Sequence, residues 1–230
     1  MSTIDQERAA ARSDVVRAWV DGWAVARSVP APIAVDGGFR LDVGLPGHLV
    51  RYVLFDVDAV AELALTRAEP GTWIKTAAPA EQVRSALTPT WTEGAPEYLM
   101  TTPLRRTRAT APAGYTIDVE TRGGLTSACL LAADRTVAAR GRVAVTGSTA
   151  VVDDVLTDPA HRRRGLGSVL MTRLADAAAE QGATTGVLVA SPAGRELYRT
   201  LGWTLRSEIT PAWIPTPDPD PIADPEAADA

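Results

Sequence analysis

Apolar residues recur at helical spacing near the start of the chain. Over residues 14–29 they follow an i, i+4 pattern, which predicts an amphipathic helix with Trp19 and Trp23 on its core-facing side. Alternating apolar and polar residues then flank a Gly-Leu-Pro-Gly turn at 44–47, which predicts a β-hairpin. The other elements expected in this part of the chain are helices over 57–67 and 80–87 and strands over 72–76 and 97–101.

The pattern changes after residue 113. Four strands are expected first, over 115–121, 127–132, 137–146 and 150–156. A glycine-containing turn and a helix ending at Gln181 follow, and then a strand over 186–190, a helix over 192–201 and a last strand over 203–209. The succession of strand, glycine turn, helix and strand predicts a parallel crossover.

These patterns divide the chain into four regions. Residues 103–113 show neither period and are expected to be a linker. An α+β domain is expected over 1–102, and a second domain over 114–210. The end, 211–230, repeats proline and aspartate and has few residues to bury, so a disordered tail is expected there.

Composition limits the class of protein. The chain has 230 residues, of which 46% are hydrophobic, and this is enough to bury a sizeable core. The net charge of -5 arises near the end of the chain, from Asp218, Asp220, Asp224, Glu226 and Asp229. The remainder is close to neutral, so binding to nucleic acid is not expected. The lone Cys129, the polar start and the lack of a long apolar run predict a cytoplasmic protein away from membranes, and no cluster of metal ligands appears.

The stretch PAHRRRGLGS, residues 159–168, joins a strand to a helix. Its amides lie at the positive end of that helix, where an anion such as phosphate binds. Gly165 and Gly167 lack the Cβ atoms that would hold an anion away from these amides. The loop therefore predicts a site for a phosphorylated small molecule, with added positive charge from Arg162, Arg163 and Arg164.

Other interpretations of this loop are weaker. A dinucleotide-binding fingerprint needs a third glycine, and a Walker loop needs Gly-Lys-Ser/Thr; both are missing. A solvated basic turn remains an alternative. Contact with nucleic acid through Arg162 to Arg164 is another, and it would weaken steeply with salt.

A second motif favours the phosphate interpretation. Arg162, Gly165 and Gly167 match the Arg/Gln-x-x-Gly-x-Gly/Ala motif of the GNAT superfamily of acyl-CoA-dependent N-acetyltransferases, and Leu197 to Trp203 match its later Leu-Tyr-x-x-Leu-Gly-Phe/Trp signature. The chain resembles this family over about 115–209. The resemblance implies an α/β (α+β) fold in which a mixed, mostly antiparallel sheet contains a parallel β-α-β crossover that is splayed to admit CoA.

The resemblance also implies a set of cofactor contacts. The pantetheine arm would enter between the splayed strands and pair with Leu156 and Thr157, because edge pairing uses main-chain hydrogen bonds. Ser191 stands where the family often has an asparagine that contacts pantetheine. The pyrophosphate would lie over the loop residues Arg162, Arg163, Arg164, Gly165, Leu166, Gly167 and Ser168.

Candidate catalytic residues follow from the same resemblance. Tyr198 matches the tyrosine that commonly protonates the departing CoA thiolate, and its alternative role is packing on Trp203. Asp153 and Asp154 precede the loop, as an acidic pair does in some members, and either would serve as the base. Strand alternation predicts that their side chains point to opposite faces.

One departure from the family affects the acceptor site. Members usually insert two helices between their first two strands, and 121–127 leave no room for them. We therefore expect the amino-terminal domain, or a second subunit in a homodimer, to wall the acceptor site. The overall expectation is transfer of acetyl from acetyl-CoA to a primary amine in a ternary complex without metal; a non-catalytic acyl-CoA sensor is the alternative. The acceptor stays open among small metabolites, antibiotics, aminoacyl groups and protein amino termini.

Overall fold

The protein is represented by a computed structural model, which describes residues 3–217, with side chains from residue 12 onward. The helices are α1 (Thr3–Arg27), α2 (Val57–Thr66), α3 (Ala80–Ala86), α4 (Leu166–Glu180) and α5 (Pro192–Thr200). The strands are β1 (Ile33–Val35), β2 (Gly38–Leu45), β3 (His48–Leu54), β4 (Thr72–Thr76), β5 (Thr92–Glu93), β6 (Glu97–Pro103), β7 (Tyr115–Arg122), β8 (Leu125–Ala132), β9 (Val137–Thr146), β10 (Thr149–Thr157), β11 (Thr185–Ala190) and β12 (Thr204–Trp213). A short 3-10 turn, Pro159–His161, precedes α4.

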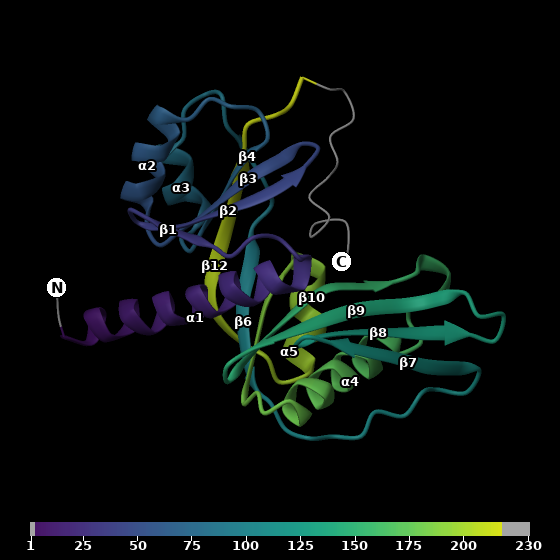
Figure 1. Ribbon diagram of the computed structural model, residues 1–230. Helices are drawn as coiled ribbons and strands as arrows, with labels where there is room; N and C mark the ends of the chain where they lie inside the picture. Colours follow the sequence, from purple (N-terminus) through teal and green to yellow (C-terminus); the bar gives the residue numbers. More distant parts are fainter. Residues whose placement is uncertain (1–2, 218–230) are drawn as a thin grey trace.

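Strand β12 joins two units of structure into one sheet (Figure 1). The strand order is β1-β2-β3-β4-β12-β6-β11-β10-β9-β8-β7, and β5 pairs with β12 beside this path. The first half of β12 pairs with β6 over Thr204 to Ile209, and its second half pairs with β4 over Thr210 to Trp213. We call β1–β5 with α2 and α3 the upper unit, and β6–β11 with α4 and α5 the lower unit, as they stand in Figure 1.

Each unit contains a parallel β-α-β crossover. In the upper unit β3 and β4 run parallel and are connected through α2. In the lower unit β10 and β11 run parallel and are connected through α4. The remaining pairs of neighbouring strands are antiparallel. The mixed, mostly antiparallel sheet expected from the sequence is therefore confirmed, as is the crossover around the glycine loop.

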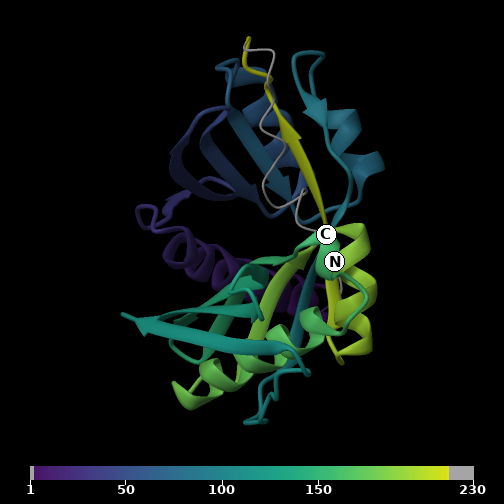
Figure 2. The same cartoon turned by 90° about the vertical axis from the view of Figure 1, so that its right-hand side faces the viewer.

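Helix α1 runs along the junction of the two units (Figures 1 and 2). The buried Trp19 and Trp23 belong to a core cluster that takes side chains from both units. Gly22 faces β10 so closely that a Cβ there would lie 2.3 Å from Val151 Cγ2, so the helix backbone needs this glycine to reach the strand. The predicted helix is confirmed and begins earlier than residue 14, and it covers the sheet face opposite α4 and α5.

Two boundaries differ from the regions expected from the sequence. Strand β6 begins at Glu97, yet it lies between β11 and β12 in the lower part of the sheet, so the lower unit starts before residue 103. Strand β12 continues to Trp213 with Ala212 fully buried, so residues 211–213 are not part of a tail. Both differences come from pairing between distant segments, which local patterns do not encode. Residues 218–230 of the expected tail lie outside the described chain.

Candidate active site

The parallel strands of the lower crossover separate after a short shared stretch. Strands β10 and β11 pair only from Thr149–Thr185 to Val151–Val187. Beyond this point β10 continues with β9, and β11 continues with β6 as far as Ala190. The register of β10 shifts between Asp153 and Leu156, and Asp154 has a left-handed φ of +54°. The facing edges of the two strands are thus open where the resemblance implied a splay.

The glycine loop leaves the start of α4 open. Gly165 is the N-cap of α4 with a φ of +76°, and no side chain caps the helix there. The first amides of a helix have no acceptor within it, so they attract an anion. At Gly167 a Cβ would lie 3.2 Å from Leu197 Cδ2 and 3.8 Å from Thr157 Oγ1, so a side chain would fill the space between β10, α4 and α5.

This space is a cavity of about 320 Å³. We call it the larger cavity because it is the larger of the two cavities at this site. It is lined by Val155, Leu156, Thr157, Arg162, Arg163, Gly165, Leu166, Gly167, Ser168, Ala193, Gly194, Leu197 and Tyr198. The structure therefore brings together nearly every residue that the sequence assigned to a cofactor. It adds Val155, Ala193 and Gly194, which belong to neither sequence motif, and Leu197, which belongs to the later signature.

The three arginines of the loop differ in what they contact. The Arg162 Nε donates to the Thr157 carbonyl at 3.2 Å, which fastens the loop to the end of β10. Arg163 lines the larger cavity and has a φ of +64°. Arg164 does not line it: its guanidinium donates to Tyr115 Oη at 2.9 Å and to the Ala160 carbonyl at 3.3 Å. Arg164 thus holds the loop in shape, while Arg162 and Arg163 lie at the cavity.

A smaller cavity of about 40 Å³ adjoins the larger one. It is lined by Trp19, Arg27, Val152, Asp153, Asp154, Val155, Leu188, Val189, Ala190, Ser191, Gly194 and Tyr198. The two cavities share Val155, Gly194 and Tyr198. Tyr198 is 8% exposed and also packs on Trp203, with ring centroids 6.1 Å apart, so both roles considered for it fit its position. It stands where the two cavities meet.

Both carboxylates of the acidic pair line the smaller cavity, contrary to the expectation of opposite faces. The left-handed backbone at Asp154 breaks the alternation that a regular strand would impose. Asp153 forms an ion pair with Arg27, whose Nε lies 2.5 Å from Oδ2. Asp154 forms ion pairs with Arg142 and, at 3.2 Å, with Arg140.

The two arginines determine the ionisation of Asp154. Burial raises its pKa, but the hydrogen bonds and charges of Arg142 and Arg140 together lower it below the ordinary value. Asp154 is therefore ionised at neutral pH and is a weak proton acceptor. Arg142 also donates to the Ala26 carbonyl at 3.0 Å, so it links this bulge to the last turn of α1.

Sequence reasoning missed the contribution of α1 to this site. Trp19 was assigned to the core and Arg27 to nothing, yet both line the smaller cavity. Arg27 meets Asp153 across 126 residues of sequence, and no local signal marks such a pair. Helix α1 thus forms part of the wall of the smaller cavity.

Ser191 caps α5, since its Oγ accepts from the Gly194 amide at 3.1 Å, and it also lines the smaller cavity. Among the residues from 12 to 217, no group of three or more His, Cys, Asp or Glu side chains could hold a metal ion. Within the described chain, no helix is both long enough and apolar enough to cross a membrane.

Comparison with known proteins agrees with this geometry. A family model described as "Acetyltransferase (GNAT) family" matches residues 80–203, more than half of the chain. The protein belongs to this family, whose members transfer acyl groups. The matched region starts before the resemblance noted in the sequence and includes β6. A search of curated proteins found no match.

Solved structures share the fold at low sequence identity. A GCN5-related N-acetyltransferase from Kribbella flavida superposes with a TM-score of 0.62 at 17% identity, over 89% of this chain and 95% of its own. A putative GNAT acetyltransferase from Novosphingobium aromaticivorans gives 0.58 at 18% identity, over 87% and 97%. The shared fold therefore includes most of the upper unit as well as the lower one.

Proposed function

We propose that the protein is an acetyl-CoA-dependent N-acetyltransferase that acts on a primary amine. The observation that carries this proposal is the junction of two cavities at Tyr198. The larger cavity ends at an open helix N-terminus, and the smaller one ends at a carboxylate pair. A phosphate-bearing carrier and an amine acceptor can therefore approach each other from opposite sides.

The larger cavity fits the carrier. The open edge of β10 at Leu156 and Thr157 offers main-chain groups to the pantetheine arm, as an added strand would use them. The amides at the start of α4 and the guanidiniums of Arg162 and Arg163 offer positive charge to the pyrophosphate. Gly167 keeps the space between these groups free of a side chain.

The smaller cavity supports a short acyl group. Its volume of about 40 Å³ is bounded by Trp19, Val152 and Leu188, which are all buried. A long acyl chain that extended into this cavity would need these side chains to move and would also displace the amine. We therefore assign acetyl-CoA as the preferred donor.

The chemistry we assign is direct acyl transfer. The neutral amine attacks the thioester carbonyl, and backbone amides near Leu156 stabilise the negative charge that develops on its oxygen. The carbon–sulfur bond then breaks, and the Tyr198 hydroxyl donates a proton to the thiolate. The amine loses a proton to a carboxylate of the acidic pair, directly or through water. The products are an amide and free CoA.

Of the two carboxylates, we assign the base to Asp153. Asp154 has a lowered pKa and is held by two arginines at the bulge, which suits a structural role. Asp153 is only 8% exposed, lines the cavity and is oriented by Arg27. Arg27 is therefore assigned as a positioning residue for the base.

One observation favours the sensor alternative: both carboxylates form ion pairs with arginines. A screen of acyl-CoA donors against a broad amine panel, with product detection by mass spectrometry, separates the two functions. We expect acetylated product with at least one amine. Tight CoA binding without product on any amine would instead identify a non-catalytic acyl-CoA-binding protein.

A further inference from the structure

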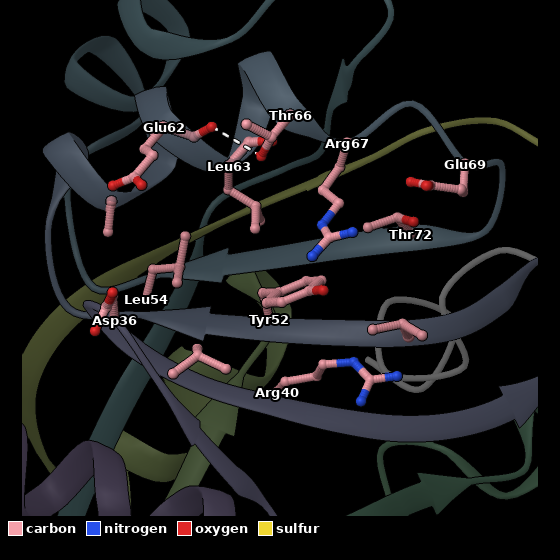
Figure 3. A pocket seen from close by; sticks show the side chains of 13 residues that line it. Asp36, Arg40, Tyr52, Leu54, Glu62, Leu63, Thr66, Arg67, Glu69 and Thr72 are labelled. Atoms are coloured by element: carbon pink, nitrogen blue, oxygen red, sulfur yellow. Dashed lines mark hydrogen bonds between the residues drawn. The ribbon is translucent and has the colours of Figure 1, made fainter.

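The upper unit contains a cavity of its own, of about 540 Å³ (Figure 3). It lies on the face of β1–β4 that α2 covers in part, and α2 forms one wall. None of its lining residues lines either cavity of the active site. Its volume falls within the range of about 300–1,000 Å³ that is usual for small-molecule sites.

The middle of this upper cavity is apolar. The side chains of Tyr52 and Leu54 on β3 form its floor, and Leu63 of α2 faces them. Tyr52 is 5% exposed and Leu54 is 1% exposed, so the floor is fixed by the core beneath it. A ligand here would bury a hydrocarbon or peptide segment against the tyrosine ring.

The two ends of the upper cavity carry opposite charge. Arg40 and Arg67 lie on either side of Tyr52, and the carboxylate of Glu69 lies at the same end as Arg67, so the lining residues of this end carry two positive charges and one negative charge (Figure 3). Asp36 and Glu62 lie toward the other end, which is negative. The guanidinium carbon of Arg67 is 6.0 Å from the centroid of the Tyr52 ring. The distribution of charge therefore suits a molecule with a negative group at one end and a positive group at the other.

We propose that the upper cavity binds a short zwitterionic peptide. Its carboxylate would lie between Arg40 and Arg67, its body over Tyr52, and its ammonium group near Asp36 and Glu62. Paired guanidiniums are suited to a carboxylate, because each presents planar donors that form charge-assisted hydrogen bonds. A single α-amino acid carries its two charged groups on the same carbon atom, so it would not reach both ends.

The charged groups at the cationic end are accessible to such a ligand. Arg40 forms an ion pair with Asp42, but the side chains are 34% and 43% exposed, and exposed pairs contribute little free energy. Arg67 follows the last turn of α2, and its backbone N–H bonds to the Leu63 carbonyl, so truncating its side chain leaves the helix end intact.

The test uses tri-alanine as the probe, and calorimetry measures its binding to the full chain. We expect tri-alanine to bind at least about tenfold more tightly than tri-alanine amide, which lacks the carboxylate, or N-acetyl-tri-alanine, which lacks the ammonium group. In Arg67→Ala the preference for the free carboxylate over the amide should fall to near unity. Arg122→Ala removes an exposed arginine from β7 in the lower unit and should leave the preference unchanged.

A second variant blocks the upper cavity without changing its charges. The Thr66 hydroxyl bonds only to the helix carbonyls of Glu62 and Leu63 among the described contacts, so Thr66→Trp fills the cavity at little cost to α2. It should abolish binding of tri-alanine while leaving CoA binding intact. Because Thr66 lines neither cavity of the active site, this loss distinguishes the upper cavity from the acceptor site, and binding that persists at saturating CoA distinguishes it from the CoA site.

Three results would overturn the proposal. The first is no binding of tri-alanine up to roughly 10 mM, a concentration at which a ligand with a Kd of about 1 mM would nearly saturate the site. The second is an unchanged carboxylate preference in Arg67→Ala. The third is binding that survives Thr66→Trp. None of them bears on the proposed acetyl transfer, whose failure would show only in the product screen.

Discussion

The two parallel crossovers of this protein have the same order of elements but differ in how far their strands stay paired. In the upper unit, β3 and β4 stay paired over the whole shared length, from Val50–Thr72 to Leu54–Thr76. In the lower unit, β10 and β11 part after Val151–Val187. The upper crossover is therefore a closed piece of sheet, and the lower one is open on the side of α4.

The starts of the two crossover helices also differ, because α2 has a capping side chain and α4 has none. At α2 the carboxylate of Asp56 accepts a hydrogen bond from the Ala59 amide at 3.0 Å, so the protein supplies its own anion. At α4 the N-cap is Gly165, which supplies none. Of the two β-α-β units, the lower one alone combines a helix start without a side-chain cap and separated strands, which is why we propose it as the anion site.

The largest effect should come from giving α4 a capping carboxylate like that of α2. Gly165→Asp places a carboxylate where we assign the pyrophosphate, and two neighbouring negative groups repel each other strongly. We expect acetyl-CoA affinity to fall roughly 100-fold, measured by calorimetry. Gly165→Asn is the control, since asparagine meets the same left-handed φ without the charge. Equal losses in the two variants would mean that backbone strain, not charge, is responsible.

The next change separates binding from chemistry in the lower unit. Tyr198→Phe removes the assigned acid at the junction of the cavities, so turnover should fall by at least about tenfold while the Kd for CoA stays within about twofold. Tyr98→Phe, on β6 under the guanidinium of Arg195, is a matched control and should change neither quantity. Unchanged turnover in Tyr198→Phe, with chemistry limiting the rate, would remove the acid assignment.

A smaller effect should come from the bulge that separates the lower strands. Because the pKa of Asp154 is lowered in the folded protein, its contribution to stability is present above the ordinary carboxyl pKa of about 4 and is lost as pH falls through the folded value. Asp154→Asn should lower the free energy of unfolding by about 1–2 kcal/mol at pH 7.

The same variant should lose less stability than the wild type on acidification, which denaturant titrations between neutral and acid pH would measure. Asparagine tolerates the left-handed φ, so the change reports on charge. Asp118→Asn replaces an exposed carboxyl on β7 and is the control. Parallel acid limbs for the wild type and Asp154→Asn would contradict the ion-pair account.

The smallest effect should follow from removing the cap of the upper crossover helix, α2. Asp56→Ala removes the cap of α2 and should cost about 1 kcal/mol of unfolding free energy, measured in urea. It should not create a CoA site there, because β3 and β4 remain paired. Asp58→Ala, in the first turn of the same helix, is the comparison, and a loss as large as that in Asp56→Ala would argue against the capping role.

Local motifs predicted the part of the site that local sequence builds. The glycine loop, Tyr198 and the order of elements around them follow from residues close together in the chain, and the structure places them together. The ion pair of Arg27 with Asp153 and the turn of Arg164 toward Tyr115 depend on packing between distant segments. The extent of β12 likewise depends on β4, so neither the unit boundary nor the role of α1 was visible in the sequence.

We propose that acetyl-CoA binds at the lower crossover and not at the upper one. Amide hydrogen exchange with and without acetyl-CoA tests it directly. Exchange should slow at residues 154–157 on the open edge of β10 and at 165–168 at the start of α4, and it should not change at 56–59 at the start of α2. Protection at 56–59, or none at 165–168 under saturating acetyl-CoA, would contradict the account.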